Sequence, residues 1–194
     1  DTATLDTLPA REYRAGLAEV VKYGVILDEE FFEYLERTTD DIQQRNPAIL
    51  IDIIERSCQL KAKIVAEDER EESGQRAILN YGHTFAHAFE VVTGCREVRQ
   101  GEAVAIGMVC AARTAVRLGI CTAEEADRQE ALIRAAGLPT TMGGADPAKI
   151  MAAMALDKKA EGGKVRFVLT EKIGRANIYM DISHDILEEV VSRK

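Results

Sequence analysis

The sequence lacks an apolar run long enough to cross a membrane, and its first residues do not form a signal peptide. We therefore expect a soluble, cytoplasmic protein. It also lacks a C-x-x-C pair. The four cysteines, Cys58, Cys95, Cys110 and Cys121, show no disulfide framework, and this spacing is typical of reduced, mostly buried thiols.

The sequence also lacks an excess of positively charged residues. Lys and Arg number 25 against 33 Asp and Glu, which gives a net charge of −8. This balance argues against general nucleic-acid binding, although an acidic protein can still hold a local basic pocket. We expect neither a nucleic acid nor a membrane as partner. A chain of 194 residues with 46% hydrophobic residues can bury a core as one domain or two small ones.

The periodicity and capping signals predict a mainly α, multi-helical domain with one short β-hairpin. The expected helices are Ala10–Tyr23, Asp28–Glu36, Asn46–Glu69, Gly101–Leu118, Thr122–Ala136, Asp146–Ala155 and Ser183–Val191, and the expected strands are Val165–Leu169 and Ala176–Met180. In the third helix the residues expected to face the core are Leu50, Ile53, Ile54, Leu60, Ile64 and Val65. The acidic run from Glu67 to Glu72 is interpreted as a solvated helix end.

The stretch from Arg76 to Glu90 reads R-A-I-L-N-Y-G-H-T-F-A-H-A-F-E and holds two of the three histidines. On a continuous helix, Arg76, Asn80, His83 and His87 would share one face. A polar helix face meeting water is the simpler interpretation, but four such different groups in one register favour a site. H-x-x-x-H without the zincin glutamate does not indicate a metalloprotease. The third histidine, His184, is expected at the surface.

Two further features stay open on spacing alone. Glu19 and Lys22 lie three apart on the first helix and are interpreted as a surface ion pair. The first nine residues carry no initiator methionine and are typical of the end of a preceding segment. We expect residues 1–9 to be a linker and residues 10–194 to form the helical domain.

Several long motifs then occur in a fixed order. They are L-P-A-R-E-Y-R-A-G-L-A-E-V-V-K-Y-G (Leu8–Gly24), L-K-A-K-I-V-A-E-D-E-R-E (Leu60–Glu71), the Arg76–Glu90 stretch, G-E-A-V-A-I-G-M (Gly101–Met108), the G-L-P of Gly137–Pro139 and the D-K-K of Asp157–Lys159. Together they closely resemble the C-terminal domain of the 3-dehydroquinate synthase family. The sequence has no G-x-G-x-x-G motif, so it resembles the helical half alone, without the family's N-terminal NAD-binding half.

The resemblance implies an enzyme of the shikimate pathway. Such enzymes convert 3-deoxy-D-arabino-heptulosonate 7-phosphate to 3-dehydroquinate and phosphate, using NAD transiently and a divalent metal, zinc or cobalt. The family also suggests a homodimer.

The resemblance further implies roles for individual residues. The matched metal ligands are Glu19 and His83. The matched anion-binding and catalytic positions are Lys22, Lys61, Arg76, Asn80, His87, Lys158 and Lys159, with the choice between the two last lysines left open. A segment contacting NAD matches Thr4, Leu5, Asp6 and Thr7.

One position departs from the family pattern. Before G-E-A-V-A-I-G-M the family supplies a third metal-binding histidine, where this sequence has Gln100. An amide oxygen is a weaker zinc ligand than imidazole, so the sequence predicts a weakened metal site.

Three alternatives remain at this point. Cyclases making 2-deoxy-scyllo-inosose or valiolone products share much of the pattern and differ in the substrate pocket. Metal-dependent alcohol dehydrogenases have a similar helical half but lack the R-x-x-x-N-Y-G-H-T-F-x-H run. A non-catalytic, metal-free helical module would also fit the presence of Gln100.

Overall fold

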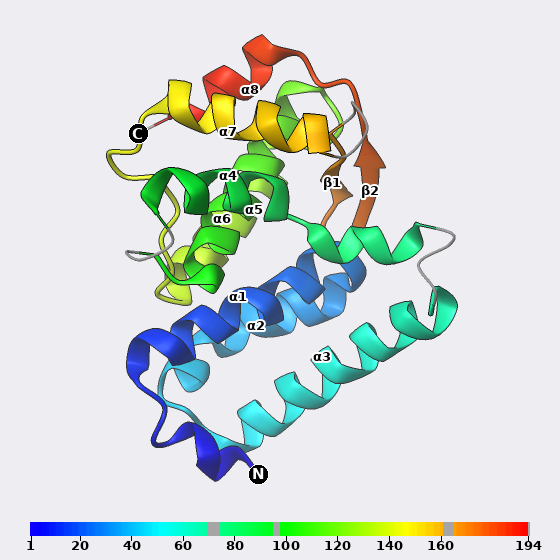
Figure 1. The fold of residues 1–194 in the computed structure, drawn as a ribbon. Coiled ribbons are helices and arrows are strands. Elements are labelled where there is room, and N and C mark those ends of the chain that lie inside the picture. Colours follow the sequence, from blue (N-terminus) through cyan, green and yellow to red (C-terminus); the bar gives the residue numbers. More distant parts are fainter. Residues whose placement is uncertain (70–73, 95–97, 161–164, 194) are drawn as a thin grey trace.

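The computed structural model describes residues 1–69, 74–94, 98–160 and 165–193, with the backbone alone for residues 157–160. Its elements are η1 (Thr2–Leu5), α1 (Ala10–Leu27), α2 (Glu29–Gln43), α3 (Pro47–Glu67), η2 (Gln75–Asn80), α4 (His83–Thr93), α5 (Gln100–Arg117), α6 (Ala123–Ala135), α7 (Pro147–Ala160), β1 (Phe167–Lys172), β2 (Arg175–Tyr179) and α8 (His184–Val191). The predicted mainly α fold with one short hairpin is confirmed (Figure 1).

Helix α5 is the centre of the core, and it contacts α1, α4, α6, α8 and β1. Small side chains let these neighbours approach closely, since Ala103, Ala105 and Ala111 are at most 1% exposed. A Cβ atom on Gly107 would lie 2.1 Å from the carbonyl oxygen of Gly82, so α4 begins directly against α5. Helix α5 therefore runs through the interior of the protein.

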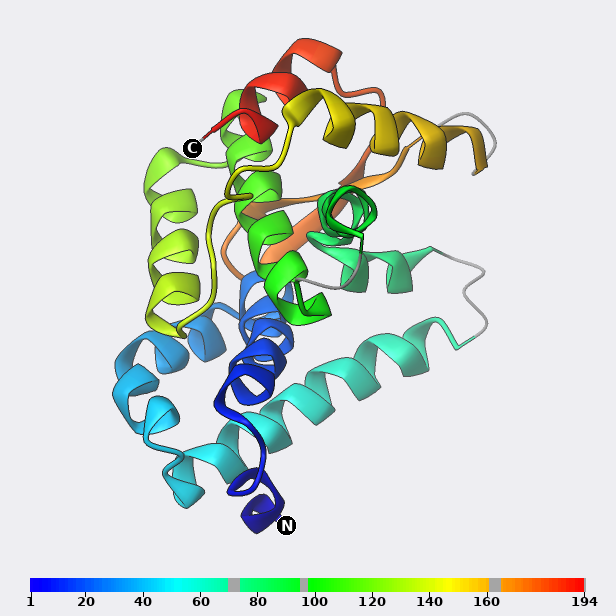
Figure 2. The same cartoon turned by 60° about the vertical axis from the view of Figure 1, so that its left-hand side comes forward.

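Helices α1, α2 and α3 contact one another on the N-terminal side of the molecule (Figures 1 and 2). Helices α2 and α3 each begin directly after a capping side chain. Asp28 Oδ1 accepts a hydrogen bond from the Phe31 N–H at 3.0 Å, and Asn46 Oδ1 accepts one from the Ala48 N–H at 3.1 Å. Both caps satisfy backbone donors that lack a partner in the first helical turn.

Three helices run further than predicted: α1 to Leu27 instead of Tyr23, α2 to Gln43 instead of Glu36, and α7 to Ala160 instead of Ala155. In α2 the reason lies at Thr38 and Thr39. Their hydroxyls donate to carbonyls one turn earlier, at 2.8 and 2.7 Å, so these residues are satisfied inside the helix instead of ending it.

The stretch from Arg76 to Glu90 is not one continuous helix, so the predicted single face of four polar groups is wrong. A 3-10 helix, η2, ends at Asn80, and α4 begins at His83. Between them Gly82 adopts φ +80°, a left-handed conformation that breaks the helix. His83 and His87 remain one turn apart on α4, as predicted.

The prediction for the face of α3 is confirmed in part. Leu50, Ile53 and Ile64 are buried, whereas Ile54 is 41% exposed because only one side of α3 packs on α1 and α2. Leu60 and Val65 are half-buried. In the acidic run after this helix, Asp68 is only 5% exposed, so a fully solvated helix end is wrong for this residue. Residues 70–72 of the run lie outside the described residues.

The hairpin pairs β1 with β2 in antiparallel register, with Phe167 opposite Tyr179. Its first strand lies two residues later than predicted at its start and ends at Lys172. Gly174 forms the turn with φ +83°, and its N–H donates to the carbonyl of Val25 at 2.8 Å. The hairpin is thus fixed to the end of α1.

Cys110 and Cys121 are buried, and burial raises the pKa of their thiols to about 12 and about 11. Both therefore stay protonated at neutral pH. Cys58 is exposed, and Cys95 lies outside the described residues. His184 is at the surface as predicted, with 68% of its side chain exposed.

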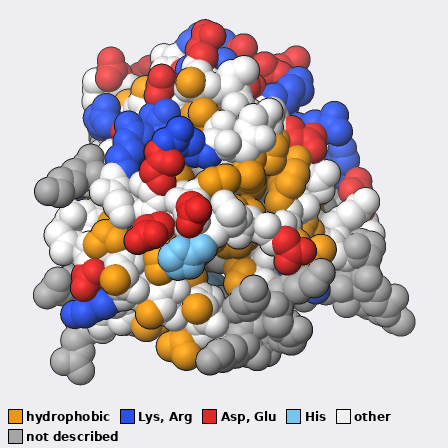
Figure 3. Space-filling view, turned by 90° about the horizontal axis from the view of Figure 1, so that it is seen from above, with side chains coloured by type: hydrophobic (Ala, Val, Ile, Leu, Met, Phe, Trp, Pro, Cys, Tyr) orange, Lys and Arg blue, Asp and Glu red, His pale blue; other side chains and the backbone are white. Residues whose placement is uncertain are grey.

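On the face seen in Figure 3, basic and acidic side chains alternate with apolar ones, so the net negative charge does not form a single-sign patch there. Among the described residues, no helix has the length and apolar character needed to span a membrane.

Candidate active site

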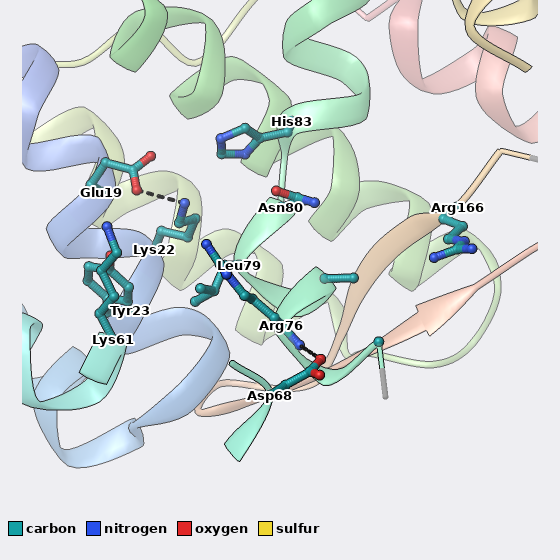
Figure 4. A pocket seen from close by; sticks show the side chains of 12 residues that line it. Glu19, Lys22, Tyr23, Lys61, Asp68, Arg76, Leu79, Asn80, His83 and Arg166 are labelled. Atoms are coloured by element: carbon teal, nitrogen blue, oxygen red, sulfur yellow. Dashed lines mark hydrogen bonds and ion pairs between the residues drawn. The ribbon is translucent and has the colours of Figure 1, made fainter. Parts of the chain in front are cut away.

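A cavity of about 380 Å³ lies where α1, α3, η2 and α4 meet (Figure 4). Four charged side chains that the sequence predicted as site residues line it: Glu19, Lys22, Lys61 and Arg76. Its other lining residues are Tyr23, Asp68, Gly74, Ala77, Leu79, Asn80, His83 and Arg166. The cavity therefore brings together cations, a carboxylate and an imidazole from segments far apart in the sequence.

Glu19 and Lys22 reach the cavity from successive turns of α1. Nζ of Lys22 lies 2.7 Å from Oε2 of Glu19, so the predicted ion pair is present. The surface interpretation is wrong for Lys22, however, since its side chain is only 4% exposed. Burial lowers the pKa of Lys22, the carboxylate of Glu19 opposes this shift, and Lys61 adds a smaller lowering.

His83 is the first residue of α4 and points into the cavity (Figure 4). Its Nδ1 lies 3.2 Å from the carbonyl oxygen of Tyr81, a contact that is favourable only if Nδ1 carries the proton. In that tautomer Nε2 keeps its lone pair. Burial, and next the positive charge of Lys22, lower the pKa of His83, so the imidazole is neutral at neutral pH.

Arg76 is placed by a buried carboxylate that sequence reasoning missed. Oδ2 of Asp68 accepts a hydrogen bond from the backbone N–H of Arg76 at 3.1 Å, across the connection between α3 and η2. Asp68 looked like one member of a solvated charge run, so only the structure separates it from its neighbours.

Arg166 is the second residue that sequence reasoning missed. It lies directly before β1, and its carbonyl accepts a hydrogen bond from Thr84 Oγ1 at 3.0 Å. An arginine before a strand carries no signal of a site. The bond to Thr84 fixes its backbone beside the start of α4, and β1 after it packs on α5 and η2.

A second cavity of about 370 Å³ shares Ala77, Asn80, His83 and Arg166 with the first. Its remaining lining residues are Thr84, His87, Val165, Val168 and Ile178. The ring centroids of His83 and His87 lie 5.9 Å apart, with the rings nearly perpendicular. His87 is exposed and lines the second cavity but not the first, whereas His83 lines both.

Gln100 is not among the residues lining either cavity. It is the exposed first residue of α5. The next residue, Gly101, packs so closely on α1 that a Cβ atom there would lie 2.0 Å from the carbonyl oxygen of Ala15, one turn before Glu19. Position 100 therefore lies beside α1, about one turn from Glu19.

The predicted NAD-contacting segment, Thr4 to Thr7, lines neither cavity. It forms η1 and the residues after it, and Arg45 holds it by donating to the carbonyls of Leu5, Asp6 and Leu8. The hydroxyls of Thr4 and Thr7 donate to local carbonyls. Lys158 and Lys159 lie at the end of α7, and their side chains lie outside the described part of the chain.

The donor set of the first cavity suits a divalent cation in part. A carboxylate and a neutral imidazole with a free Nε2 are ligand types that zinc accepts. Three or more His, Cys, Asp or Glu side chains do not converge anywhere within the described residues. Glu19 and His83 thus offer two protein ligands, and a third donor has to be of another kind.

The family described as 3-dehydroquinate synthase C-terminal matches residues 16–160. A 3-dehydroquinate synthase of Synechococcus sp. is 54% identical over 98% of this chain and 52% of its own length. One from Nitrosospira multiformis is 50% identical over 99% of this chain and 52% of its own length. The chain spans about half the length of these curated relatives.

Solved structures show the same fold. A 2-epi-5-epi-valiolone synthase from Streptomyces hygroscopicus with NAD+ and Zn2+ bound superposes with a TM-score of 0.89 at 28% identity, over 99% of this chain and 53% of its own. A 2-deoxy-scyllo-inosose synthase complexed with carbaglucose-6-phosphate, NAD+ and Co2+ gives a TM-score of 0.79 at 26% identity, over 98% of this chain and 54% of its own.

Proposed function

Because the chain belongs to the 3-dehydroquinate synthase C-terminal family, we propose that it forms the metal- and substrate-binding half of a 3-dehydroquinate synthase. In this proposal the whole protein converts 3-deoxy-D-arabino-heptulosonate 7-phosphate to 3-dehydroquinate and phosphate in the shikimate pathway. The observation that carries the proposal is the first cavity, where Lys22, Lys61 and Arg76 line the same space as Glu19 and His83.

The charges of this cavity fit such a substrate. The sugar acid carries a phosphate and a carboxylate, and anions of this kind are held by converging lysines and arginines. Arg76 offers a planar fork for one anionic group, and Lys61 and Arg166 add positive charge from two other elements. A net charge of −8 for the chain does not oppose binding, because a cation-lined cavity sets the local potential.

Glu19 and His83 would hold the divalent cation, zinc or cobalt, with Gln100 as a weak third ligand. When bound, such a cation polarises the substrate alcohol and the carbonyl formed from it. The neutral imidazole of His83 is ready to bind without losing a proton first. Lys22 balances the charge of Glu19 while remaining inside the cavity wall.

The second cavity would complete the substrate site. Asn80 lines both cavities and offers a donor and an acceptor to substrate oxygens. His87 is exposed there and is proposed to pass a proton to or from the substrate. Lys158 and Lys159 are proposed to contribute one more cation from α7.

NAD would be bound mainly by the other half of such a protein, with Thr4, Leu5, Asp6 and Thr7 as its contacts from this chain. Likewise, residues 1–9 would be the connection between the halves. A homodimer in the cytoplasm is the assembly and location that the family resemblance supports.

A different sugar-phosphate cyclase is the second candidate function. The solved relatives make valiolone- and inosose-type products, but their identity to this chain is 28% and 26%, against about 50% for the 3-dehydroquinate synthases. This difference favours dehydroquinate as the product. A metal-free, non-catalytic module is the third candidate function. Metal analysis of the purified chain distinguishes it from the enzymes, which would bind a divalent cation.

A chimera tests the proposed function directly. Residues 1–194 replace the matched half of the Synechococcus 3-dehydroquinate synthase, to which they are 54% identical. We expect the chimera to release phosphate, to form 3-dehydroquinate, and to restore growth of a strain lacking this enzyme. The same chimera with His83→Ala should do none of these. A folded, NAD-binding chimera that makes a different cyclic product, or none, would refute the proposal.

A further inference from the structure

The turn between η2 and α4 decides which nitrogen of His83 faces the cavity. Its Nδ1 is 3.2 Å from the carbonyl oxygen of Tyr81, which belongs to this turn. The other nitrogen, Nε2, is the one left for a ligand. Any group that fixes the direction of the Tyr81 carbonyl therefore also fixes the proton of His83.

The side chain of Tyr81 is anchored deep in the protein. It is 0% exposed, and its hydroxyl lies 2.7 Å from Oε1 of Gln129 and 3.2 Å from the carbonyl oxygen of Met108. Burial strongly raises the pKa of this phenol, so the hydroxyl is always a donor at physiological pH. Both of its neighbours are acceptors, and the shorter contact is to Gln129.

Gln129 and Thr170 continue this chain of polar groups away from the cavity. Both are 0% exposed, and Nε2 of Gln129 donates to Oγ1 of Thr170 at 3.4 Å. Gln129 comes from α6 and Thr170 from β1, elements that contribute no side chain to the first cavity. The oxygen of the Gln129 amide faces Tyr81 and its nitrogen faces Thr170, so this one side chain links the two hydroxyls.

The backbone on the other side of Tyr81 has no room to move. A Cβ atom on Gly82 would lie 2.7 Å from the backbone nitrogen of Met108, and one on Gly107 would lie 2.1 Å from the carbonyl oxygen of Gly82. The turn is thus held at two points, by the tyrosine ring and by the glycine seated on α5. The Tyr81 carbonyl lies between these points.

We propose that Tyr81, Gln129 and Thr170 form a positioning relay that keeps the proton of His83 on Nδ1 and presents Nε2 to the cavity. The relay rests on the proposed function for its purpose, because a free Nε2 matters only if His83 binds a cation. Stability alone does not require these groups, since a buried polar set can be replaced by apolar side chains of similar shape at little cost. Apolar side chains at these positions would lack the directional hydrogen bonds that the three polar groups make.

The test reads the tautomer of His83 directly, in the 194-residue chain labelled with 15N-histidine. The sequence has three histidines, so His87→Gln and His184→Gln assign the signals. Spectra that correlate ring nitrogens with ring protons, at about pH 8 where histidine is neutral, report which nitrogen carries the proton. We expect Nδ1–H for His83. A proton on Nε2 in the unaltered chain would overturn the proposal.

The variant removes the polar relay and keeps its volume, with Tyr81→Phe, Gln129→Leu and Thr170→Val combined. We expect the folded variant to lose the fixed Nδ1–H state and to bind Co2+ about 10–100-fold more weakly, with an altered Co2+ absorption spectrum. The matched control is Tyr13→Phe, which removes another buried hydroxyl, bonded at 2.6 Å to the carbonyl of Ile42; neither residue lines the two cavities. It should change neither readout.

If the triple variant does not fold, Thr170→Val and Thr170→Ser form the decisive pair, because only Ser keeps the hydroxyl. Val should weaken the His83 tautomer preference and Ser should keep it. Unchanged Nδ1–H in a folded triple variant, or in Thr170→Val, would show that the relay has no positioning role. An inactive chimera with an intact tautomer effect would refute the proposed function and leave the relay standing.

Discussion

Nζ of Lys22 lies 2.7 Å from Oε2 of Glu19, but the two partners of this ion pair face different surroundings. The side chain of Lys22 is 4% exposed and that of Glu19 is 44% exposed. Because burial is the largest influence on Lys22, its pKa lies below the ordinary value of 10.5 despite the neighbouring carboxylate. Keeping the buried ammonium group of Lys22 charged therefore costs folding free energy.

Lys22→Met should remove that cost and leave Glu19 in water. We expect the free energy of unfolding at about pH 7 to change by less than about 1 kcal/mol. A lowered folded pKa means that the unfolded chain binds more protons between that pKa and 10.5, so the stability of the unaltered chain rises with pH across this window. The variant lacks this contribution, and urea unfolding at about pH 7 and about pH 10 measures the difference. Lys172→Met, at a residue 59% exposed, is the matched control for removing an exposed lysine.

Arg76→Lys should weaken the binding of inorganic phosphate or sulfate in the first cavity. Lysine keeps the charge but loses the planar pair of donors, and we expect about a tenfold loss, equivalent to about 1.4 kcal/mol. Titration calorimetry on the purified chain measures it. Arg37→Lys, at a residue 65% exposed on α2, is the matched control. Equal affinities of all three proteins would show that Arg76 does not bind the anion.

The local features of the fold were predictable because neighbouring residues determine them. Asp28 and Asn46 cap α2 and α3, and Thr122 with Glu125 forms the capping box of α6. These signals act over three residues, so a sequence shows both partners. Helix ends without such a signal, as in α2, were placed too early.

The site was predictable only through the resemblance, and its geometry depends on packing that spacing does not contain. The burial of Lys22 and the break at Gly82 both result from contact with other elements. Arg166 reaches the cavity through a hydrogen bond between its carbonyl and Thr84, 82 residues earlier. A helical register therefore grouped Arg76 with His87, whereas the folded chain places them in two adjoining cavities.

Gln100→His should raise zinc affinity by at least about tenfold, on the scale of changes around metal ligands. The start of α5 packs on α1 one turn before Glu19, so an imidazole at position 100 has a short distance to cover. Competition against a chelator measures the affinity. Gln59→His, at an exposed position on α3, controls for an added histidine. Equal affinities of the Gln100→His and Gln59→His proteins would place the metal site elsewhere.

The 194-residue polypeptide alone should form no 3-dehydroquinate from the phosphorylated sugar acid, even with NAD and zinc added. The proposed first step needs a nicotinamide held within about 3–3.5 Å of the reacting carbon, and this sequence has no dinucleotide-binding motif. Phosphate release is the measurement, with the full-length Synechococcus relative assayed beside it. Product from the polypeptide alone would mean that NAD binds within these residues.

Gly107→Ala should disturb the first cavity, because it alters the packing of α4 on α5. The added Cβ atom would lie 2.1 Å from the carbonyl oxygen of Gly82, which is backbone and has no flexible end to move aside. Either α4 and the turn before it shift away from α5, or the helices separate, and we expect a loss of about 1–3 kcal/mol in the free energy of unfolding. Because His83 follows Gly82 directly, Co2+ affinity should fall as well.

The matched control is Gly16→Ala in α1, where a Cβ atom meets nothing within 4 Å and should stabilise the helix by up to about 1 kcal/mol. Urea unfolding and Co2+ titration of both variants decide the matter, and a Gly107→Ala protein as stable as the unaltered chain would contradict the close packing of α4 on α5.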